Sequence, residues 1–453
     1  MIKTLRYYYW LVIEFFKKNS KLIILAFFIS LIFSLTLTTV YPYFESLVII
    51  KKKIVGLVNN SYSLSDLPDE INYQVSNGLI SVDETGRVIP LLAKDWRIED
   101  NGKRFIFRLK PNLIWNDGVK VSTKEFKYNF KGVKTYTPDD QTIIFELASP
   151  LPIFINYLKK PIIKYPLVGI GGSYYLGKTV KKNERIKEIN LLPIKKNLPP
   201  LCYRFYRSDD EMIAAYKKGE VREMVSDKRA LIEPLLRWKN TEVIKNTDYK
   251  RLYTLFFNLE KPFLKDRDSR ISLRMAVDLN KVNQYGQIAL VSIPPISWAY
   301  NTDLKPWSYE PEVAKKIITK DDSKKEIKLT LYSYFEYAEI VSLISDWLEK
   351  IGVRVNVRYI SGSMPPPDFD LFLVALNIPD DPDQYFFWHS SQKQTNIAHY
   401  VNLKIDKLLE DGRQKTFFAN QRREFYLSFQ KNLYDDPPAI FLFYPYSYLV
   451  RRK

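Results

Sequence analysis

The chain has very little of two residue types that carry much of protein chemistry. Its 453 residues include one cysteine, Cys202, and two histidines, His389 and His399. A disulfide within the chain is therefore excluded, and these residues form no recognisable metal-ligand set or nucleophile–histidine triad. Cys202 stands in the strand-like stretch CYRFY. We expect it to be a small core residue rather than a nucleophile.

Other function classes also lack their usual signals. Gly169, Gly171 and Gly172 are not followed by the Lys-Ser/Thr of a phosphate-binding loop, so they favour a tight turn before a strand. The formal charge is +18, but basic residues are spread along the chain and form no nucleic-acid-binding module. Carboxylates are abundant, yet nothing selects a catalytic pair. We expect a protein that is not an enzyme and that uses no cofactor or metal.

One long stretch near the N-terminus carries no charge. Leu22 to Phe44 contains no Asp, Glu, Lys or Arg, and at about 1.5 Å rise per residue a helix of this length spans roughly 35 Å, enough to cross a bilayer core. The run is too long for a typical signal peptide, and no small-residue cleavage site follows it. We predict an uncleaved transmembrane signal anchor at 22–44, behind a short cytoplasmic or interfacial segment at 1–21.

Basic residues on both sides of this run indicate its orientation. Lys51, Lys52 and Lys53 follow the run, and five basic residues precede it: Lys3, Arg6, Lys17, Lys18 and Lys21. Positive charge favours the cytoplasmic side of a span. The sequence therefore predicts a single-pass protein of the plasma membrane with its N-terminus inside and its large C-terminal part extracellular or periplasmic.

The stretch from Leu91 to Phe130 has strong local signals. Arg104 to Leu109 alternates as a half-buried strand does, with Phe105, Phe107 and Leu109 on one face. Turn sequences stand at Asp100-Asn101-Gly102 and Asn116-Asp117-Gly118. Ser122 and Glu125 have the spacing of a capping box, which predicts a helix reaching about Phe130.

The same stretch resembles the family 5 extracellular solute-binding proteins, which serve peptide-type and related ABC importers. The matching positions are Leu92-Ala93, Trp96, Asn101-Gly102-Lys103, Phe105, Phe107, Trp115, Asp117-Gly118, Thr123 and Glu125-Phe126. A second similar segment contains Phe257-Asn258, Pro262-Phe263, Asp266, Arg270 and Asp278. In the family this second segment is where the chain passes between lobes. The resemblance covers about residues 54 to 450 and identifies a scaffold, not a ligand.

The resemblance implies an α/β, two-lobed periplasmic-binding-protein-like fold of type II, the large peptide-binding class. We expect lobe I at 54–256 with an inserted subdomain at about 66–164, lobe II at 257–428, and a return to lobe I at 429–453. Within it, local patterns predict strands at 53–58, 142–147, 201–206, 327–332, 353–359, 368–375 and 439–444, and helices at 208–217, 338–350 and 422–433. Hinge motion is expected near Leu255–Asn258.

In that family a peptide lies extended between the lobes, and an acidic residue pairs with its α-amino group. The corresponding stretch here is LVALNIPDDPDQYFF, in which Ile378 stands where the acid is expected. A buried ammonium without a counter-charge costs several kcal/mol. Two alternatives follow: the ligand has no free amine, or a local shift brings in Asp380 or Asp381.

The candidate substrate-binding residues come from this stretch and its neighbours. They are Trp298, Tyr300, Asn377, Ile378, Asp380, Asp381, Trp388, Asn396 and Tyr400. For Asn396 and Tyr400 the alternative is a structural role in tying loops to lobe II. For Trp298, Tyr300 and Trp388 the alternative is an ordinary core or surface position.

The function implied is that of a membrane-anchored extracellular protein that binds a peptide or similar small solute and delivers it to an ABC transporter permease. The expected partners are the solute, the permease and the membrane through the N-terminal helix, with no nucleic acid. The alternative is a transport-degenerate sensor or partner-binding surface protein on the same scaffold. The inner segment of about 20 residues holds no signalling domain, which weighs against signalling by the chain alone.

Overall fold

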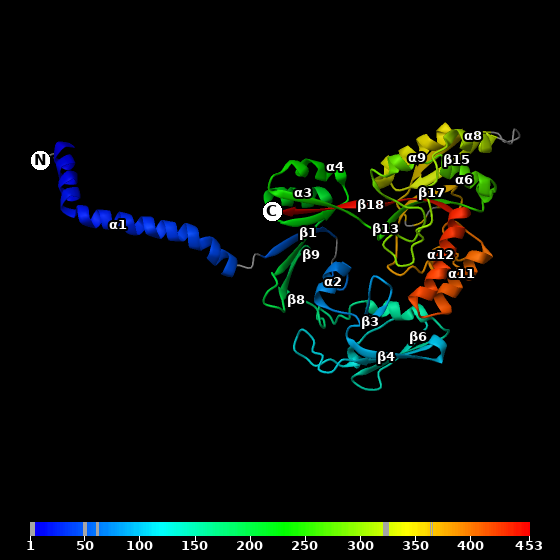
Figure 1. Cartoon of the computed structure of the whole chain (residues 1–453), viewed down its shortest axis with the longest axis horizontal. Helices are drawn as coiled ribbons and strands as arrows, with labels where there is room; N and C mark the ends of the chain where they lie inside the picture. The colour runs from blue at the N-terminus through cyan, green and yellow to red at the C-terminus, as the bar shows by residue number, and fades with distance from the viewer. Residues whose placement is uncertain (1–4, 49–51, 60–62, 320–325, 363, 365) are drawn as a thin grey trace.

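One long strand, β18 (Ala439–Arg452), joins the two halves of the main body (Figure 1). The computed structural model describes residues 5–48, 52–59, 63–319, 326–362, 364 and 366–453. In these residues β18 belongs to a twelve-stranded sheet with the order β16-β15-β17-β13-β18-β11-β1-β10-β9-β8, and β12 and β14 also pair with β18. The first half of β18 pairs with β13 and β14, and its second half with β11 and β12.

We call the half around the C-terminal part of β18 lobe I. Its strands are β1 (Lys53–Val58), β8 (Tyr174–Lys182), β9 (Arg185–Pro193), β10 (Leu201–Tyr206), β11 (Glu223–Ser226) and β12 (Thr241–Thr247). Strand β1 lies parallel between β10 and β11. The helices are α2 (Asp69–Val75), α3 (Asp209–Lys218) and α4 (Arg229–Ile232), followed by the 3-10 turn η4 (Glu233–Arg237). Cys202 on β10 is free and fully buried, as expected.

Helix α3 illustrates how local chemistry sets an element of lobe I. The side chain of Ser208 accepts a hydrogen bond from the backbone N–H of Glu211 at 3.3 Å, and Gly219 closes the helix with a φ of 82°. Only glycine adopts such a left-handed C-cap without strain. The helix predicted at 208–217 is therefore confirmed.

We call the half around the N-terminal part of β18 lobe II. Its other strands are β13 (Arg251–Phe257), β14 (Gly286–Ile288), β15 (Ile327–Ser333), β16 (Val353–Tyr359) and β17 (Leu371–Asn377). Its helical elements are α5 (Pro262–Lys265), α6 (Arg267–Met275), α7 (Leu279–Val282), α8 (Pro311–Thr319), η5 (Phe335–Tyr337), α9 (Ala338–Lys350), α10 (Tyr385–Trp388), α11 (Leu403–Gln414) and α12 (Ala419–Asp435).

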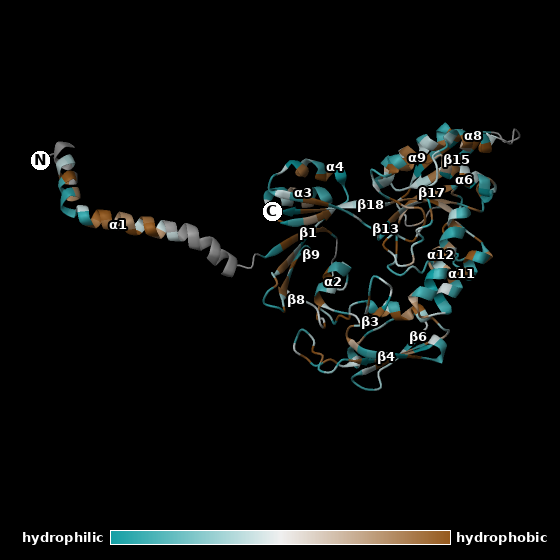
Figure 2. Cartoon of the chain, viewed as in Figure 1, coloured by the Kyte–Doolittle hydropathy of each residue, from teal (hydrophilic) through white to brown (hydrophobic). Residues whose placement is uncertain are grey.

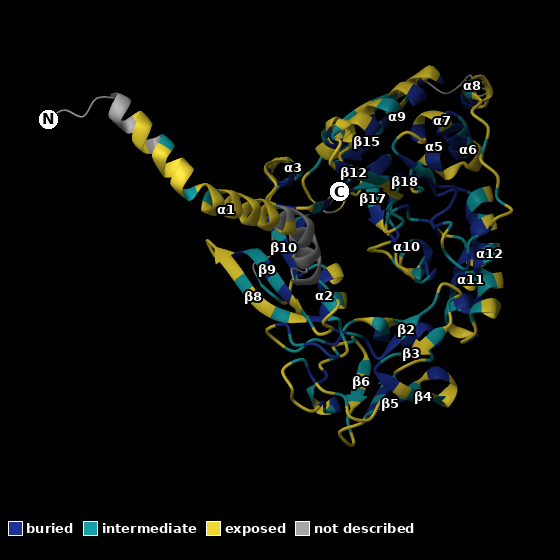
Figure 3. Cartoon of the chain, turned by 60° about the vertical axis from the view of Figure 1, so that its left-hand side comes forward, coloured by how far each residue is buried: buried dark blue, intermediate teal, exposed yellow. Residues whose placement is uncertain are grey.

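Helix α9 packs on this sheet through the face that its sequence predicts. Its buried residues are Ile340, Val341, Ile344, Trp347 and Leu348. They join one core cluster with β13, β15 and β17. Figure 3 shows β17 in lobe II largely buried, whereas β8 at the edge of lobe I is largely exposed.

A separate four-stranded antiparallel sheet, with the order β4-β5-β7-β6, forms a subdomain. Its strands are β4 (Ala93–Glu99), β5 (Arg104–Leu109), β6 (Val133–Tyr136) and β7 (Thr142–Leu147), and the hairpin β2 (Ile80–Val82) and β3 (Val88–Pro90) precedes them. The remaining 3-10 elements are η1 (Asp100–Gly102), η2 (Thr123–Glu125) and η3 (Pro152–Lys159). Phe105, Phe107 and Leu109 are buried, which confirms the predicted strand and its inner face.

The helix predicted from Ser122 to Phe130 is wrong beyond its first turn. The capping box is present, but Phe126 is extended and only η2 forms. Tyr128 and Phe130, two residues apart, both pack against Phe145. This spacing of two is that of an extended chain, so the aromatic core of the subdomain overrides the local helix signal.

The chain passes from lobe I to lobe II in a short turn after β12. Because β12 pairs with the second half of β18 and β13 with the first half, the change falls at residues 248–250. The backbone N–H of Asp248 donates to the carbonyl of Pro445 in β18 at 2.8 Å. The crossing expected at Leu255–Asn258 lies instead inside lobe II, where strand pairing holds those residues.

Helix α1 (Leu5–Val48) extends away from the main body (Figures 1 and 2). Within the described part of the chain, no helix combines the length and the apolar character needed to cross a membrane. Residues 1–4 of the predicted inner segment lie outside the described residues, as do the side chains of Leu35 and residues 37–44 in the predicted span.

Candidate functional site

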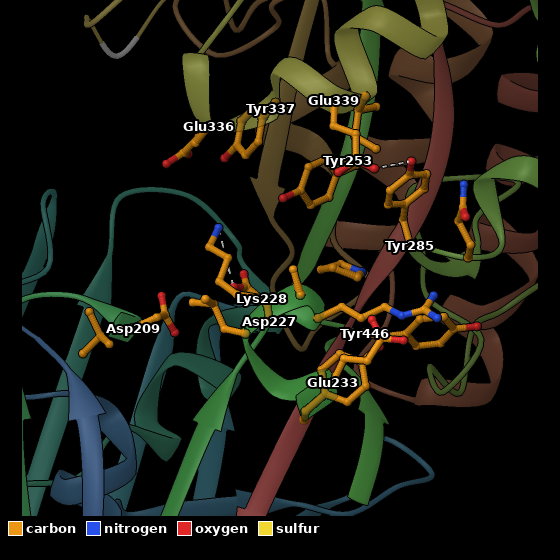
Figure 4. Close-up of a pocket in the computed structure, with 18 of the residues that line it drawn as sticks. Asp209, Asp227, Lys228, Glu233, Tyr253, Tyr285, Glu336, Tyr337, Glu339 and Tyr446 are labelled. Carbon is orange, nitrogen blue, oxygen red and sulfur yellow. Dashed lines mark hydrogen bonds and ion pairs between the residues drawn. The ribbon is translucent and has the colours of Figure 1, made fainter. Parts of the chain in front are cut away.

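A cavity of about 770 Å³ lies between the two lobes, beside the strands that cross between them. Lobe I contributes residues 207–210, residues 227–231 and Glu233, and lobe II contributes Tyr253, residues 284–285, residues 336–337 and residues 339–340. Figure 4 shows Asp227 and Lys228 on one side facing Tyr337 and Glu336 on the other. We call this cavity the inter-lobe cleft. Its volume is that of a site for a small-molecule ligand.

The lobe II wall of this cleft is a continuous set of aromatic rings. Tyr253 on β13 lies opposite Phe443 on β18, and their rings stack with centroids 4.5 Å apart. The Tyr285 ring also stacks against Phe443, with centroids 6.0 Å apart, and Tyr337 meets Tyr253 edge to face at 5.0 Å. Such cross-strand and ring contacts keep a wall rigid before a ligand arrives.

The position of Tyr285 depends on the glycine that follows it. A side chain at Gly286 would place its first carbon 2.1 Å from the carbonyl oxygen of Tyr444. Gly286 pairs with Pro445 across the β14–β18 ladder. Only a residue without a side chain allows this close approach, and the approach brings Tyr285 against Phe443.

The tyrosine hydroxyls of this wall stay protonated at neutral pH. Burial raises the pKa of Tyr253 to about 12, with Asp227 and Glu336 adding to the shift and Arg251 opposing it. Burial also raises the pKa of Tyr285 to about 12, together with Glu339, whose carboxylate accepts the Tyr285 hydroxyl at 2.8 Å. The wall therefore presents neutral hydroxyls beside ring faces.

On the lobe I side, an ion-pair network fixes the turn that crosses between the lobes. Arg251 donates to Asp248 at 2.7 Å and pairs with Asp227 at 2.9 Å. Burial alone would lower the pKa of Arg251, but the two carboxylates outweigh it and raise the pKa. Asp227 also lies 3.7 Å from Lys228, so its charge is largely neutralised within the protein.

Two smaller cavities, of about 450 and 420 Å³, flank the segment from Asn377 to Asp381 where it faces the subdomain. Ile378, Asp380 and Asp381 line both, Trp298 lines the first, and Asn377 lines the second. The structure thus brings these five sequence-predicted residues together beside η3, away from the aromatic wall of the inter-lobe cleft.

The two aspartates of this segment are already paired. Arg422 donates to both carboxylate oxygens of Asp381, at 2.6 and 3.0 Å, and Asn156 of the subdomain donates to it as well. Lys159 of the subdomain pairs with Asp380 at 2.6 Å. The Asp380 carboxylate therefore connects this segment to the subdomain, and the Asp381 carboxylate connects it to both α12 and the subdomain.

Three other predicted residues lie in the core of lobe II. Trp388 is fully buried, and its ring lies 5.7 Å from that of Phe256. The Asn396 side chain donates to the Tyr400 carbonyl at 2.8 Å and accepts from the Tyr400 backbone N–H at 3.0 Å. The Tyr400 hydroxyl donates to Asp436 at 3.0 Å. These contacts fit the structural alternative.

The last predicted pair comes from the segment before α8. Trp298 has the guanidinium of Arg422 5.4 Å from its ring and lines the 450 Å³ cavity. Tyr300 is partly buried, and burial raises the pKa of its hydroxyl. It lines neither the inter-lobe cleft nor the two smaller cavities.

Sequence reasoning missed the tyrosines of the inter-lobe cleft. They are Tyr253, Tyr285, Tyr337, Tyr446 and Tyr448. They come from distant segments and share no motif. The abundance of tyrosine, 32 residues, is a signal for a tyrosine-rich surface, but it does not say which residues meet.

Metal ligation has no support among the residues that the structure describes, which include no group of three or more His, Cys, Asp or Glu side chains able to hold an ion. His389 stacks on Tyr385 at 4.1 Å, and its Nδ1 accepts from the Ser391 backbone N–H at 3.1 Å. Its local contacts are those of a packed residue.

Comparison with known proteins gives a consistent result. The family model described as "Bacterial extracellular solute-binding proteins, family 5 Middle" matches residues 87–397. The oligopeptide-binding protein AppA of Bacillus subtilis is 24% identical over 87% of this chain and 85% of its own length. The dipeptide-binding protein of Escherichia coli is 22% identical over 79% of this chain and 81% of its own.

A solved structure shares the fold. NikZ from Campylobacter jejuni, in complex with Ni(L-His), superposes with a TM-score of 0.70 at 24% identity, covering 89% of this chain and 94% of that one. Relatives on this scaffold are thus named for different solutes. The scaffold alone does not select among them.

Proposed function

Because this chain belongs to the bacterial extracellular solute-binding proteins of family 5, we propose that it captures a peptide or similar small solute between its lobes and delivers it to an ABC transporter permease. Relatives named as oligopeptide- and dipeptide-binding proteins support the peptide class. Binding and release, without catalysis, is the activity we assign to it.

The observation that carries this proposal is the inter-lobe cleft. Its lining comes from both lobes, so a ligand in it contacts both and favours their closure. The described chain crosses between the lobes at residues 248–250 and at Pro445 in β18. We place the hinge there, because a few residues between packed elements absorb the rotation in such closures.

We propose that the segment from Asn377 to Asp381 does not bind a free α-amine. Ile378 supplies no charge, Asp381 is engaged by Arg422, and Asp380 is engaged by Lys159. Capture of an ammonium by either aspartate would require breaking an existing pair. Calorimetry with a peptide and its N-acetylated form, repeated on Asp380→Asn and Asp381→Asn variants, tests this, and a loss of affinity on acetylation that either variant abolishes would contradict it.

The function itself is tested by the solute that the protein retains. The full chain, purified in mild detergent and denatured, should release a ladder of short peptides or one small compound detectable by mass spectrometry. Peptides added to the emptied protein should then bind with measurable heat. A cleft that stays empty after incubation with peptides would contradict the transport proposal and favour the sensor or partner-binding alternative.

We propose further that the N-terminal helix tethers the protein to the plasma membrane with the lobes outside. The uncharged run at 22–44 and its basic flanks support this assignment. Membrane fractions washed with carbonate should retain the full chain, and protease added to intact cells or spheroplasts should digest the lobes. Complete release by carbonate would contradict the tether.

A further inference from the structure

The inter-lobe cleft carries an excess of negative charge in a chain that is basic as a whole. Six acidic side chains line it: Asp209, Asp210, Asp227, Glu233, Glu336 and Glu339. Three basic side chains line it: Arg207, Lys228 and Arg229. The formal charge of the chain is +18. A cleft of opposite sign to its protein concentrates cationic solutes and repels anionic ones.

On lobe I, four acidic lining residues lie among three basic ones, whereas on the lobe II wall Glu336 and Glu339 have no basic lining residue beside them. Among the described residues, no lysine or arginine forms an ion pair with Glu336 or Glu339, whereas Asp227 across the cleft is paired with Arg251 and Lys228. Glu339 accepts one hydrogen bond, from Tyr285. Its carboxylate keeps further acceptor capacity for a ligand.

Aromatic faces stand beside these two carboxylates. The rings of Tyr253 and Tyr337 meet at 71°, with centroids 5.0 Å apart. Glu336 precedes Tyr337 directly on η5, and burial and Glu336 both raise the pKa of Tyr337. Figure 4 shows Glu336, Tyr337, Tyr253 and Glu339 along one side of the cleft. Carboxylates beside tyrosine faces are the surroundings that ammonium and guanidinium groups favour.

We propose that this wall, formed by Glu336, Glu339 and the rings of Tyr253 and Tyr337, binds a cationic group of the transported solute, an ammonium or a guanidinium. The proposal rests on the proposed function and names the solute class, a basic peptide or a comparable small cation. The positive charge of the solute is then bound here, and not at the segment from Asn377 to Asp381, whose carboxylates already pair with Lys159 and Arg422.

The test compares two peptides that differ only in charge. N-acetylated Ala-Arg-Ala and its citrulline analogue have the same shape, and their affinities for the full chain are measured by calorimetry. The arginine peptide should bind about tenfold more tightly, or ~1.4 kcal/mol. Glu336→Gln with Glu339→Gln should remove this preference and leave the citrulline peptide unaffected.

A matched variant controls for the change of net charge. Asp346→Asn with Glu349→Gln also removes two carboxylates, both exposed in the C-terminal half of α9 and neither lining the cleft; it should leave both affinities unchanged. Equal binding of the two peptides, or a preference that survives the double substitution, overturns the inference while the proposed function stands. Failure of all added peptides to bind overturns both.

Discussion

At the scale of single residues, burial decides what an aspartate–arginine pair contributes. Asp381 and Arg422 form a two-point pair in which the arginine side chain is 6% exposed. Asp95 and Arg108 form a similar pair, at 2.7 and 2.8 Å, but that arginine is 52% exposed. Water reaches the second pair readily, whereas the arginine of the first is almost wholly enclosed by protein.

Replacing Asp381 by Asn should therefore destabilise the protein far more than replacing Asp95 by Asn. Loss of one partner leaves the Arg422 charge buried without compensation, which costs about 3 kcal/mol or more. The exposed pair is worth about 1 kcal/mol or less. Urea unfolding of the two variants measures the difference, and equal midpoints would contradict the role assigned to burial.

At the scale of elements, β14 is a short strand whose function is to place the residue before it. Its three residues pair with β18, and Tyr285 just before it joins the aromatic wall. The absence of a side chain at Gly286 is what lets the two backbones approach. The close approach that Gly286 allows thus sets the position of Tyr285 in the cleft.

Gly286→Ala should displace β14 and lower both stability and solute affinity. The added carbon would stand 2.1 Å from a backbone oxygen that cannot move freely, so we expect a loss of about 1–3 kcal/mol, as for other overpacked sites. Gly362→Ala is the control, since its added carbon meets nothing within 4 Å. Thermal unfolding and calorimetry report both effects; equal behaviour of the two variants would be inconsistent with this account.

At the scale of the whole molecule, the subdomain touches lobe II through polar contacts. Lys159 on η3 pairs with Asp380, and Asn156 donates to Asp381. If the lobes open around the proposed hinge, these contacts are made only in the closed form. They then contribute to apparent affinity by populating the state that holds solute.

Lys159→Gln should weaken solute binding severalfold without a comparable loss of unfolding stability, because the pair is partly exposed and bridges the subdomain and lobe II. Lys328→Gln, which breaks a pair with Glu326 inside lobe II, is the control. Calorimetry gives the affinity, and small-angle scattering should show a more extended unliganded variant. Unchanged affinity and dimensions would exclude this contact as a closing element.

The same contact has a pH dependence with a defined sign. Burial acts to raise the pKa of Asp380, but Lys159 outweighs it, so the pKa lies below its ordinary value of 3.8. The contribution of the pair to closure is therefore present above pH 3.8 and is lost as the pH falls through the lowered value.

Local elements and the scaffold could be predicted from the sequence by itself. The strand Arg104–Leu109 and the helices α3 and α9 follow from alternation, capping and a helical apolar face, signals that act within a few residues. The solute-binding family followed from motifs spread over most of the chain. The one failed helix, after Ser122, is where aromatic packing overrode a local cap.

Only the tertiary structure decided which side chains meet. Trp388 and Tyr400 lie in the core, and Asp381 forms an ion pair with Arg422. The aromatic wall instead brings together Tyr253, Tyr285 and their neighbours from separate segments. The physical reason is the range of the forces involved. Periodicity and capping are local, but a cleft arises where strand pairing and packing bring distant parts of the chain to one edge.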